Sequence, residues 1–280
     1  MALGPLALIL LSALLHAGWN ALVKRFADTR TATVGVLAVA TLAAALAAIP
    51  GDGPAFATPR ALWLGVLAGF FEGAYFATLG AALARSPLGV AYTIARGGAI
   101  LLVWPLSVTL FAEPVTTLGA AGAGVILCGL VLCALPAMRG AAGSGVFFAV
   151  LCAATIAGYH LCYKAALAAG ARPAPLFALS LAIALPPNLL LLGSRRRVLM
   201  GLFRTRALLL GLAGLVCTAS FVVFLGALSA AGAGAVLTLR NTSVLFAQGF
   251  AVLLGERPRP VEITGAVLVA IGAALIGWPR

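Results

Sequence analysis

Long apolar segments fill the chain and are separated only by short runs of charged residues, prolines and glycines. A helix that crosses the hydrocarbon core of a bilayer needs about 20 mostly apolar residues. The polar breaks divide the sequence into ten such segments: residues 3–23, 32–49, 61–83, 87–111, 115–135, 143–168, 173–193, 206–229, 233–254 and 260–278. The connections are too short for a soluble domain, so the pattern predicts an all-α integral membrane protein with ten transmembrane helices.

Composition supports this prediction. Hydrophobic residues make up 63% of the chain and charged residues only 9%, whereas a soluble domain is about half apolar and about a quarter charged. Such a chain could not cover its own surface in water, which excludes a cytosolic enzyme, a nucleic-acid-binding protein and a disordered chain. Walker A, HExxH, GxSxG and CxxC motifs are all absent from the sequence, so we expect no enzyme activity, no metal and no cofactor.

The net charge of +12 comes from basic residues that lie mainly in the loops after odd-numbered segments. Twelve lie there: Lys24, Arg25, Arg30, Arg85, Arg139, Arg195, Arg196, Arg197, Arg204, Arg206, Arg257 and Arg259. The other side holds three, Arg60, Arg172 and Arg280. By the positive-inside rule this distribution favours the odd loops in the cytoplasm and both termini outside, for a multi-pass protein of the bacterial inner membrane.

Two sequence patterns occur once in each half of the chain. Residues 17–24 read AGWNALVK and residues 157–164 read AGYHLCYK, at an offset of half the chain. Glu113 and Glu256 are each followed by glycines nine and sixteen residues later, at Gly122 and Gly129 and at Gly265 and Gly272. We therefore expect two five-helix units, residues 1–138 and 139–280. Since five is odd, the second unit enters the membrane inverted, as in many secondary transporters, whose substrate sites lie between the repeats.

Local signals within this frame give two further expectations. Glu113 and Glu256 stand close before prolines at turns between segments, where a carboxylate can accept hydrogen bonds from the free N–H groups of the next helix. Pro105 and the pair at 186–187 lie inside apolar segments, which they should kink or interrupt.

Three stretches carry a family resemblance. HAGWNALVK near the start, YTIARGG in the fourth segment and GERPRPVEITGAVLVAIGAALI near the end resemble the EamA-type members of the drug/metabolite transporter superfamily. The resemblance covers essentially the whole chain. It implies ten helices, a central cavity walled mainly by helices 1, 3, 4, 6, 8 and 9, and helices 5 and 10 at the periphery. It also implies export of amino acids, other small metabolites or drugs, and termini in the cytoplasm, opposite to the charge count.

Ionisable residues at membrane depth indicate function because they are costly to insert. Glu72 could carry a coupling proton or form an ion pair with Arg96 or Arg240. These two arginines offer donors for a substrate carboxylate or phosphate, or they could instead hold backbone carbonyls or lipid phosphate. His16, Trp19 and Asn20 share one helix face by their spacing, as do four residues on the matching segment: Tyr159, His160, Tyr163 and Lys164.

The candidate substrate-binding residues are therefore Trp19, Asn20, Tyr75, Tyr92, Arg96, Tyr159, His160, Tyr163, Arg240 and Asn241, with Glu72 for proton coupling or an ion pair. The leading hypothesis is a secondary active exporter of a small anionic or zwitterionic metabolite such as an amino acid. One alternative is a flippase for a lipid-linked anionic sugar, and another is an intramembrane enzyme with Glu72 and His160 as acid and base. The expected partners are the substrate and the bilayer, with homodimerisation left open and no nucleic acid.

Overall fold

The computed structural model describes residues 3–111, 115–138, 143–230 and 240–276. These residues form eleven α-helices and one short 3-10 helix, with no strand beyond an isolated bridge between Phe56 and Ala171. The helices are α1 (Leu3–Lys24), α2 (Thr29–Ala48), α3 (Pro59–Leu83), α4 (Leu88–Phe111), α5 (Thr117–Met138), α6 (Gly143–Ala168), α7 (Pro173–Leu191), η1 (Gly193–Arg195), α8 (Arg196–Thr205), α9 (Ala207–Ala230), α11 (Ser243–Leu253) and α12 (Pro260–Ile276).

Eight of these helices, α1 to α7 and α9, are long and apolar enough to cross a membrane. The prediction of an all-α, multi-pass membrane protein is thereby confirmed. The count of ten helices is not, because the described residues contain eleven: α8 forms where a loop was expected. The expected ninth span, 233–254, is described only from residue 240 and contains α11, with 11 residues; the tenth corresponds to α12, with 17.

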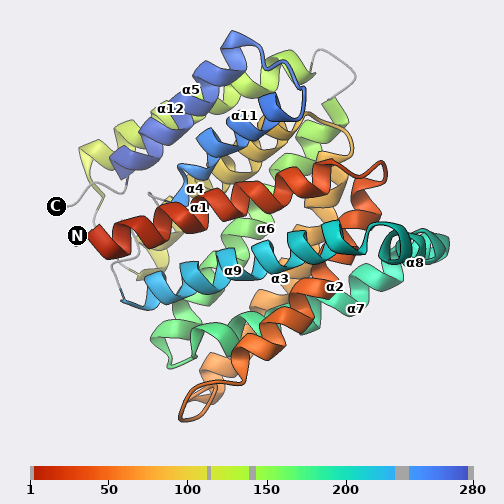
Figure 1. Cartoon of the computed structure of the whole chain (residues 1–280). Helices are drawn as coiled ribbons and strands as arrows, with labels where there is room; N and C mark the ends of the chain where they lie inside the picture. Colours follow the sequence, from red (N-terminus) through yellow and green to blue (C-terminus); the bar gives the residue numbers. More distant parts are fainter. Residues whose placement is uncertain (1–2, 112–114, 139–142, 231–239, 277–280) are drawn as a thin grey trace.

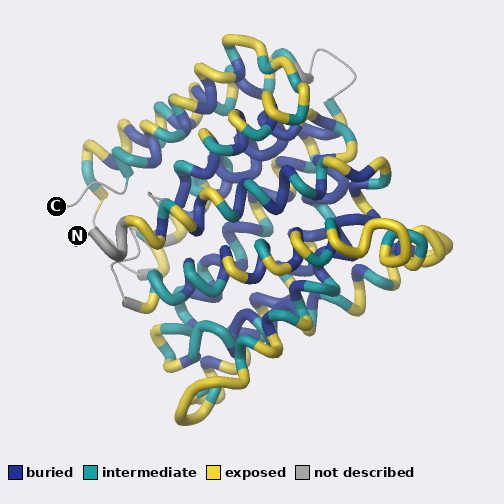
Figure 2. The backbone as a smooth tube through the Cα atoms, viewed as in Figure 1, coloured by how far each residue is buried: buried dark blue, intermediate teal, exposed yellow. Residues whose placement is uncertain are grey.

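The long helices pack as a bundle with its buried residues inside and its exposed residues along the outer edges (Figures 1 and 2). Helix α3 packs against α6 and α7, α1 packs against α9 and α11, and α4 packs against α6. Helices α5 and α12 form a closely packed pair at one edge, as the family resemblance implied. Most of the buried polar residues described below lie on the inner helices α1, α3, α4, α6 and α9.

The pair α5–α12 is held by four glycines at which the two backbones touch. A Cβ atom on Gly122 would lie 2.6 Å from the carbonyl oxygen of Gly272, and one on Gly272 would lie 2.6 Å from that of Gly122. Gly129 and Gly265 have the same reciprocal relation, also at 2.6 Å. Small residues let membrane helices approach this closely, and any side chain at these positions would separate α5 from α12.

On one face of the bundle, charged side chains form hydrogen bonds with the backbone at the ends of helices. The Lys24 ammonium donates to the carbonyls of Leu83 and Ser86 at 2.6 Å, at the end of α3. Both carboxylate oxygens of Glu256 accept from the Leu88 amide at 2.9 Å, at the start of α4. Glu256 thus caps a helix as predicted, but it caps α4 rather than the next helix in sequence, α12. The matching prediction for Glu113 lies outside the described residues.

On the opposite face, an arginine side chain makes contacts of the same kind. The Arg172 guanidinium, before α7, donates to the carbonyls of Pro50, Gly51 and Gly53, after α2. The loops after α2 and α6 therefore meet on one face, and those after α1, α3 and α11 meet on the other. This grouping agrees with the expectation that loops after odd-numbered and even-numbered segments lie on opposite sides of the membrane.

The prolines do not interrupt their helices. Helix α4 continues through Pro105, and α7 continues through Pro186 and Pro187. Next to the proline pair, the Asn188 amide donates at 2.9 Å to the carbonyls of Gly73 on α3 and Ala184 on α7. Packing against neighbouring helices can hold a transmembrane helix together across a proline, so of the two expected effects, a kink or an interruption, the interruption does not occur.

Candidate functional site

The carboxylate of Glu72 lies buried where α3, α6 and α7 meet. Beside it on α3, the backbone at Gly69 and Gly73 packs directly on α7. One carboxylate oxygen, Oε2, accepts hydrogen bonds from the Tyr163 hydroxyl and, at 2.7 Å, from the Ser180 hydroxyl. The other oxygen, Oε1, has no hydrogen-bond partner. None of the ion pairs found among the described residues includes Glu72, so its hydrogen-bond partners are hydroxyl groups, while Arg240 interacts with it electrostatically.

Arg240, just before α11, is completely buried against aromatic rings of α9. Its guanidinium carbon lies 3.6 Å from the ring centre of Phe224 and 4.7 Å from that of Phe221. A cation over an aromatic face is attracted by the ring quadrupole, most strongly where water is excluded. One terminal nitrogen, Nη2, lies 3.2 Å from Nδ1 of His16 on α1. The arginine therefore joins α1, α9 and α11 at the centre of the bundle.

His16 is the acceptor for this group of residues. Besides Arg240, its Nδ1 faces the Trp19 indole nitrogen at 3.3 Å and the Ser220 hydroxyl at 3.3 Å. Guanidinium and indole nitrogens only donate hydrogen bonds. Nδ1 must therefore carry a lone pair, which makes His16 a neutral imidazole with its proton on Nε2.

Arg96, on α4, is the second buried cation and is 5% exposed. It interacts electrostatically with Arg240, His16 and His160. In both arginines the Nε and Nη1 atoms are buried and have no hydrogen-bond partner. An unpaired charge in a low-dielectric interior is strongly destabilising, and a group that brings negative charge could satisfy these four donors.

Aromatic rings connect the carboxylate to the arginines. Tyr159, on α6, lies edge-on to Tyr163 and Tyr75 at 5.5 and 5.4 Å between ring centres, and it lies 6.2 Å from Phe221 under Arg240. His160 contacts Tyr159 at 4.7 Å. Walls of aromatic rings with a few polar tips are typical of small-molecule sites. A continuous set of contacts thus runs from Glu72 to Arg240.

Most of the residues proposed from the sequence meet in this network. Its members joined by described contacts or by electrostatic interaction are Trp19, Glu72, Tyr75, Tyr92, Arg96, Tyr159, His160, Tyr163 and Arg240. Asn20 donates to the His16 carbonyl of its own helix at 2.8 Å. Asn241 is buried, its side-chain nitrogen and oxygen have no partner, and no described contact joins it to the network. Within the described ranges, no three His, Cys, Asp and Glu side chains gather closely enough to hold a metal ion.

Sequence reasoning missed four members of the network: Ser180, Ser220, Phe221 and Phe224. The two serines were visible as lone polar residues within apolar segments. The two phenylalanines give no such signal, because an apolar residue in an apolar span has no distinguishing feature until its neighbour across the bundle is known.

A separate groove of about 790 Å³ opens on the outside of the bundle between α1, α9 and α11. Its walls are mostly apolar and include the small residues Gly18 and Ala21 and the ring of Phe250, with the exposed Arg25 among its lining residues. The groove therefore offers a lateral surface next to α1, the helix that carries His16 and Trp19.

Comparison with known proteins relates part of this chain to a family. Residues 143–278 match the model of the EamA-like transporter family. A solved structure described as "Crystal structure of protein" has a similar fold, with 20% sequence identity over 98% of this chain and 98% of that chain and a TM-score of 0.57. A search of curated proteins gives no match. The family that the sequence resembles is thereby confirmed over residues 143–278, which match the EamA-like transporter family.

Proposed function

We propose that the protein is a secondary active transporter of the bacterial inner membrane that exports a small metabolite with a carboxylate or other anionic group. The observation that carries the proposal is the pair of buried arginines, Arg96 and Arg240, with four unpartnered nitrogen donors between them. An arginine fork matches a carboxylate or phosphate in two hydrogen bonds. A bound anion would accept hydrogen bonds from these four nitrogens, which no described carboxylate contacts.

Alternating access between two inverted five-helix units, residues 1–138 and 139–280, is the proposed mechanism. The α5–α12 contact supports it. In the sequence repeat Gly122 corresponds to Gly265 and Gly129 to Gly272, while the contacts pair Gly122 with Gly272 and Gly129 with Gly265. Exchanging the repeats converts one contact into the other, as a two-fold axis between α5 and α12 requires.

Glu72 is the proposed carrier of the coupling proton. As a carboxylate it accepts from the hydroxyls of Tyr163 and Ser180, and as a carboxylic acid it can donate to either hydroxyl oxygen. Both forms therefore have partners in the same place. A group with acceptable partners in both protonation states can gain and lose a proton without disrupting the packing around it.

Electrical recording from proteoliposomes on a solid-supported membrane tests the proposal. Concentration jumps would be made with glutamate, phenylalanine, lactate and an alkylphosphonate, and with choline as the cationic comparison. We expect currents or proton movement with at least one anionic or zwitterionic compound, and their loss in Arg240→Ala. Currents with choline alone, or unchanged currents in the variant, would contradict the assignment of the arginines.

The lateral groove favours one second candidate, a flippase for a lipid-linked anionic sugar. A lipid tail could lie along its apolar wall while Arg25 and the buried arginines meet the phosphate. Gly18→Phe tests this candidate, because Gly18 lines the groove and a Cβ atom there would lie 3.9 Å from the Phe250 ring. A flippase would lose lipid translocation in vesicles, whereas an exporter of a soluble metabolite would keep its transport rate.

A further inference from the structure

Helix α8 stands where the sequence predicted only a loop between two membrane spans. It covers Arg196–Thr205 and follows the single 3-10 turn η1. Leu199, which is 7% exposed, packs against Val34 of α2 and Leu192 at the end of α7. Figure 1 shows α8 at the edge of the bundle, beyond the ends of α7 and α9. The segment is therefore an ordered helix attached to the end of the bundle.

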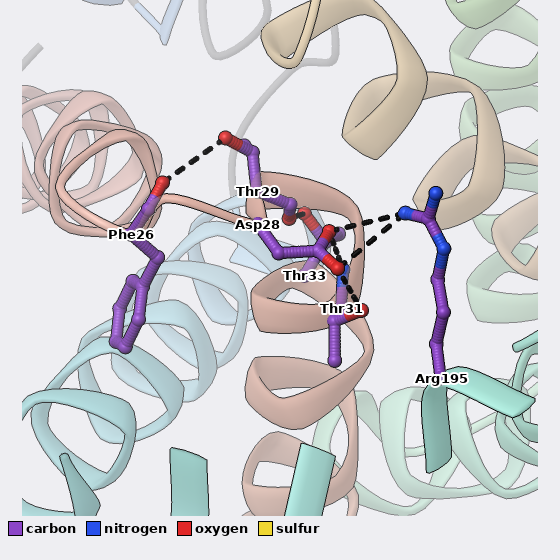
Figure 3. Close-up of polar contacts among 6 residues, drawn as sticks. All are labelled: Phe26, Asp28, Thr29, Thr31, Thr33 and Arg195. Carbon is purple, nitrogen blue, oxygen red and sulfur yellow. Dashed lines mark hydrogen bonds and ion pairs between the residues drawn. The ribbon is translucent and has the colours of Figure 1, made fainter. Parts of the chain in front are cut away.

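Two arginines at the start of α8 are engaged by the protein itself. Arg195 lies 3.4 Å from both carboxylate oxygens of Asp28 (Figure 3). Asp28 in turn caps α2 by accepting from the Thr31 amide at 3.1 Å and its hydroxyl at 2.7 Å. Arg196 donates from Nε to the Leu189 carbonyl at 3.0 Å. These contacts fix the orientation of α8 against α2 and α7.

The rest of α8 presents two kinds of exposed side chain. Arg197 and Arg204 are exposed on the face away from Leu199. Met200 and Phe203 lie on the flank between that face and the buried Leu199, with exposed fractions of 58% and 38%. Figure 2 shows the whole segment as exposed except where it meets the bundle. Large apolar residues beside arginines are the arrangement of helices that lie in the interface of a bilayer.

Helix α8 lies between two membrane spans. It follows α7 and precedes α9, which both qualify as membrane spans, so it lies at the level where hydrocarbon gives way to headgroups. Five arginines fall between residues 195 and 206, and no acidic residue does. Basic residues at this level are attracted by the negative surface potential of anionic lipids.

We propose that α8 is a membrane-surface helix that binds anionic phospholipid, with Arg197 and Arg204 on the phosphates and Met200 and Phe203 among the upper acyl carbons. The apolar flank and the basic face point to one occupant, because a neutral leaflet would leave the basic face without a counter-charge. The inference does not depend on the transported substrate.

The test uses the full chain in nanodiscs with a bimane fluorophore at Met200→Cys. The background is Cys128→Ser, since the other four cysteines are buried. Asp52→Cys, on the exposed loop of the opposite face, gives the aqueous reference. Quenching by aqueous iodide and by nitroxide-labelled lipid is compared between phosphatidylcholine and phosphatidylglycerol nanodiscs. Arg197→Gln/Arg204→Gln is the test variant, and Arg60→Gln, an exposed arginine on the opposite face, is the control.

We expect iodide quenching at position 200 to be at least threefold weaker in phosphatidylglycerol than in phosphatidylcholine, and nitroxide quenching to rise correspondingly. The double variant should lose this lipid dependence and Arg60→Gln should keep it. Raising the salt to about 0.5 M should also remove it from the unsubstituted helix, because salt screens exposed charges. Equal quenching in the two lipids, or a dependence that survives in the double variant, would overturn the proposal.

Discussion

Glu72 and the two arginines are all buried, but they differ in how their polar atoms are satisfied. One oxygen of Glu72 has two hydroxyl partners, while two nitrogens of each arginine have none. This difference separates a residue suited to hold and release a proton from residues suited to bind an anion. The two roles can therefore be tested by independent substitutions.

Glu72→Gln should abolish the dependence of transport on an imposed pH gradient and leave substrate exchange intact. Glutamine keeps an oxygen for the Tyr163 and Ser180 hydroxyls but cannot gain or lose the coupling proton. Flux driven by a pH jump and counterflow exchange would be measured in the same proteoliposomes, with Asp52→Asn as the control for a lost carboxylate. Normal pH-driven flux in Glu72→Gln would make Glu72 a structural residue.

His16→Phe should lower the stability of the folded protein by about 1–3 kcal/mol, because Arg240 and Trp19 lose their common acceptor in a buried position. His16→Gln offers a side-chain oxygen in its place and should recover part of the loss. The comparison is the thermal unfolding of both variants in the same detergent. If the two variants unfold at the temperature of the unsubstituted protein, His16 does not hold Arg240.

At the scale of whole helices, the α5–α12 pair gives a prediction with a matched control on the same helix. Gly129→Ala places a methyl group 2.6 Å from the Gly265 carbonyl oxygen, whereas nothing lies within 4 Å of a Cβ at Gly124. Overpacking of this kind destabilises by about 1–3 kcal/mol. Gly124→Ala should be neutral or slightly stabilising, because alanine favours helix. Equal unfolding temperatures for the two variants would show that the close contact does not form.

The elements themselves were predictable to different degrees. Hydropathy located α1 to α7 and α9 because each of them is apolar over a length that can cross a membrane. Helix α8 was not predicted, because a segment of ten residues with several arginines is too short and too basic to meet that criterion. The capping of α4 by Glu256 could not be foreseen either, since the two partners are 168 residues apart and only the packing of the halves brings them together.

The site was predictable in part for the same reason. The repeat placed Trp19 and Tyr159 at matching positions, and burial cost marked Glu72, Arg96 and Arg240 as functional. The contact of Arg240 with His16 spans 224 residues, and Phe221 and Phe224 acquire a role only beneath that guanidinium. Residue type thus gave the candidate side chains, and the fold determined which of them meet.

At the scale of the whole molecule, the proposed transport depends on Arg96 and Arg240 binding the anionic group of the transported metabolite. Thermal unfolding of the purified protein with a panel of amino acids, organic acids, phosphonates, nucleotide sugars and organic cations tests it most directly. A ligand at a hundred times its dissociation constant stabilises the folded state by about 2.7 kcal/mol. The unsubstituted protein is compared with Arg96→Gln, Arg240→Gln and the loop control Arg172→Gln.

We expect stabilisation by an anionic or zwitterionic class in the unsubstituted protein and in Arg172→Gln, and its loss in both variants of the buried arginines. Stabilisation by cations alone would contradict it, as would an anion effect that persists in Arg96→Gln and Arg240→Gln.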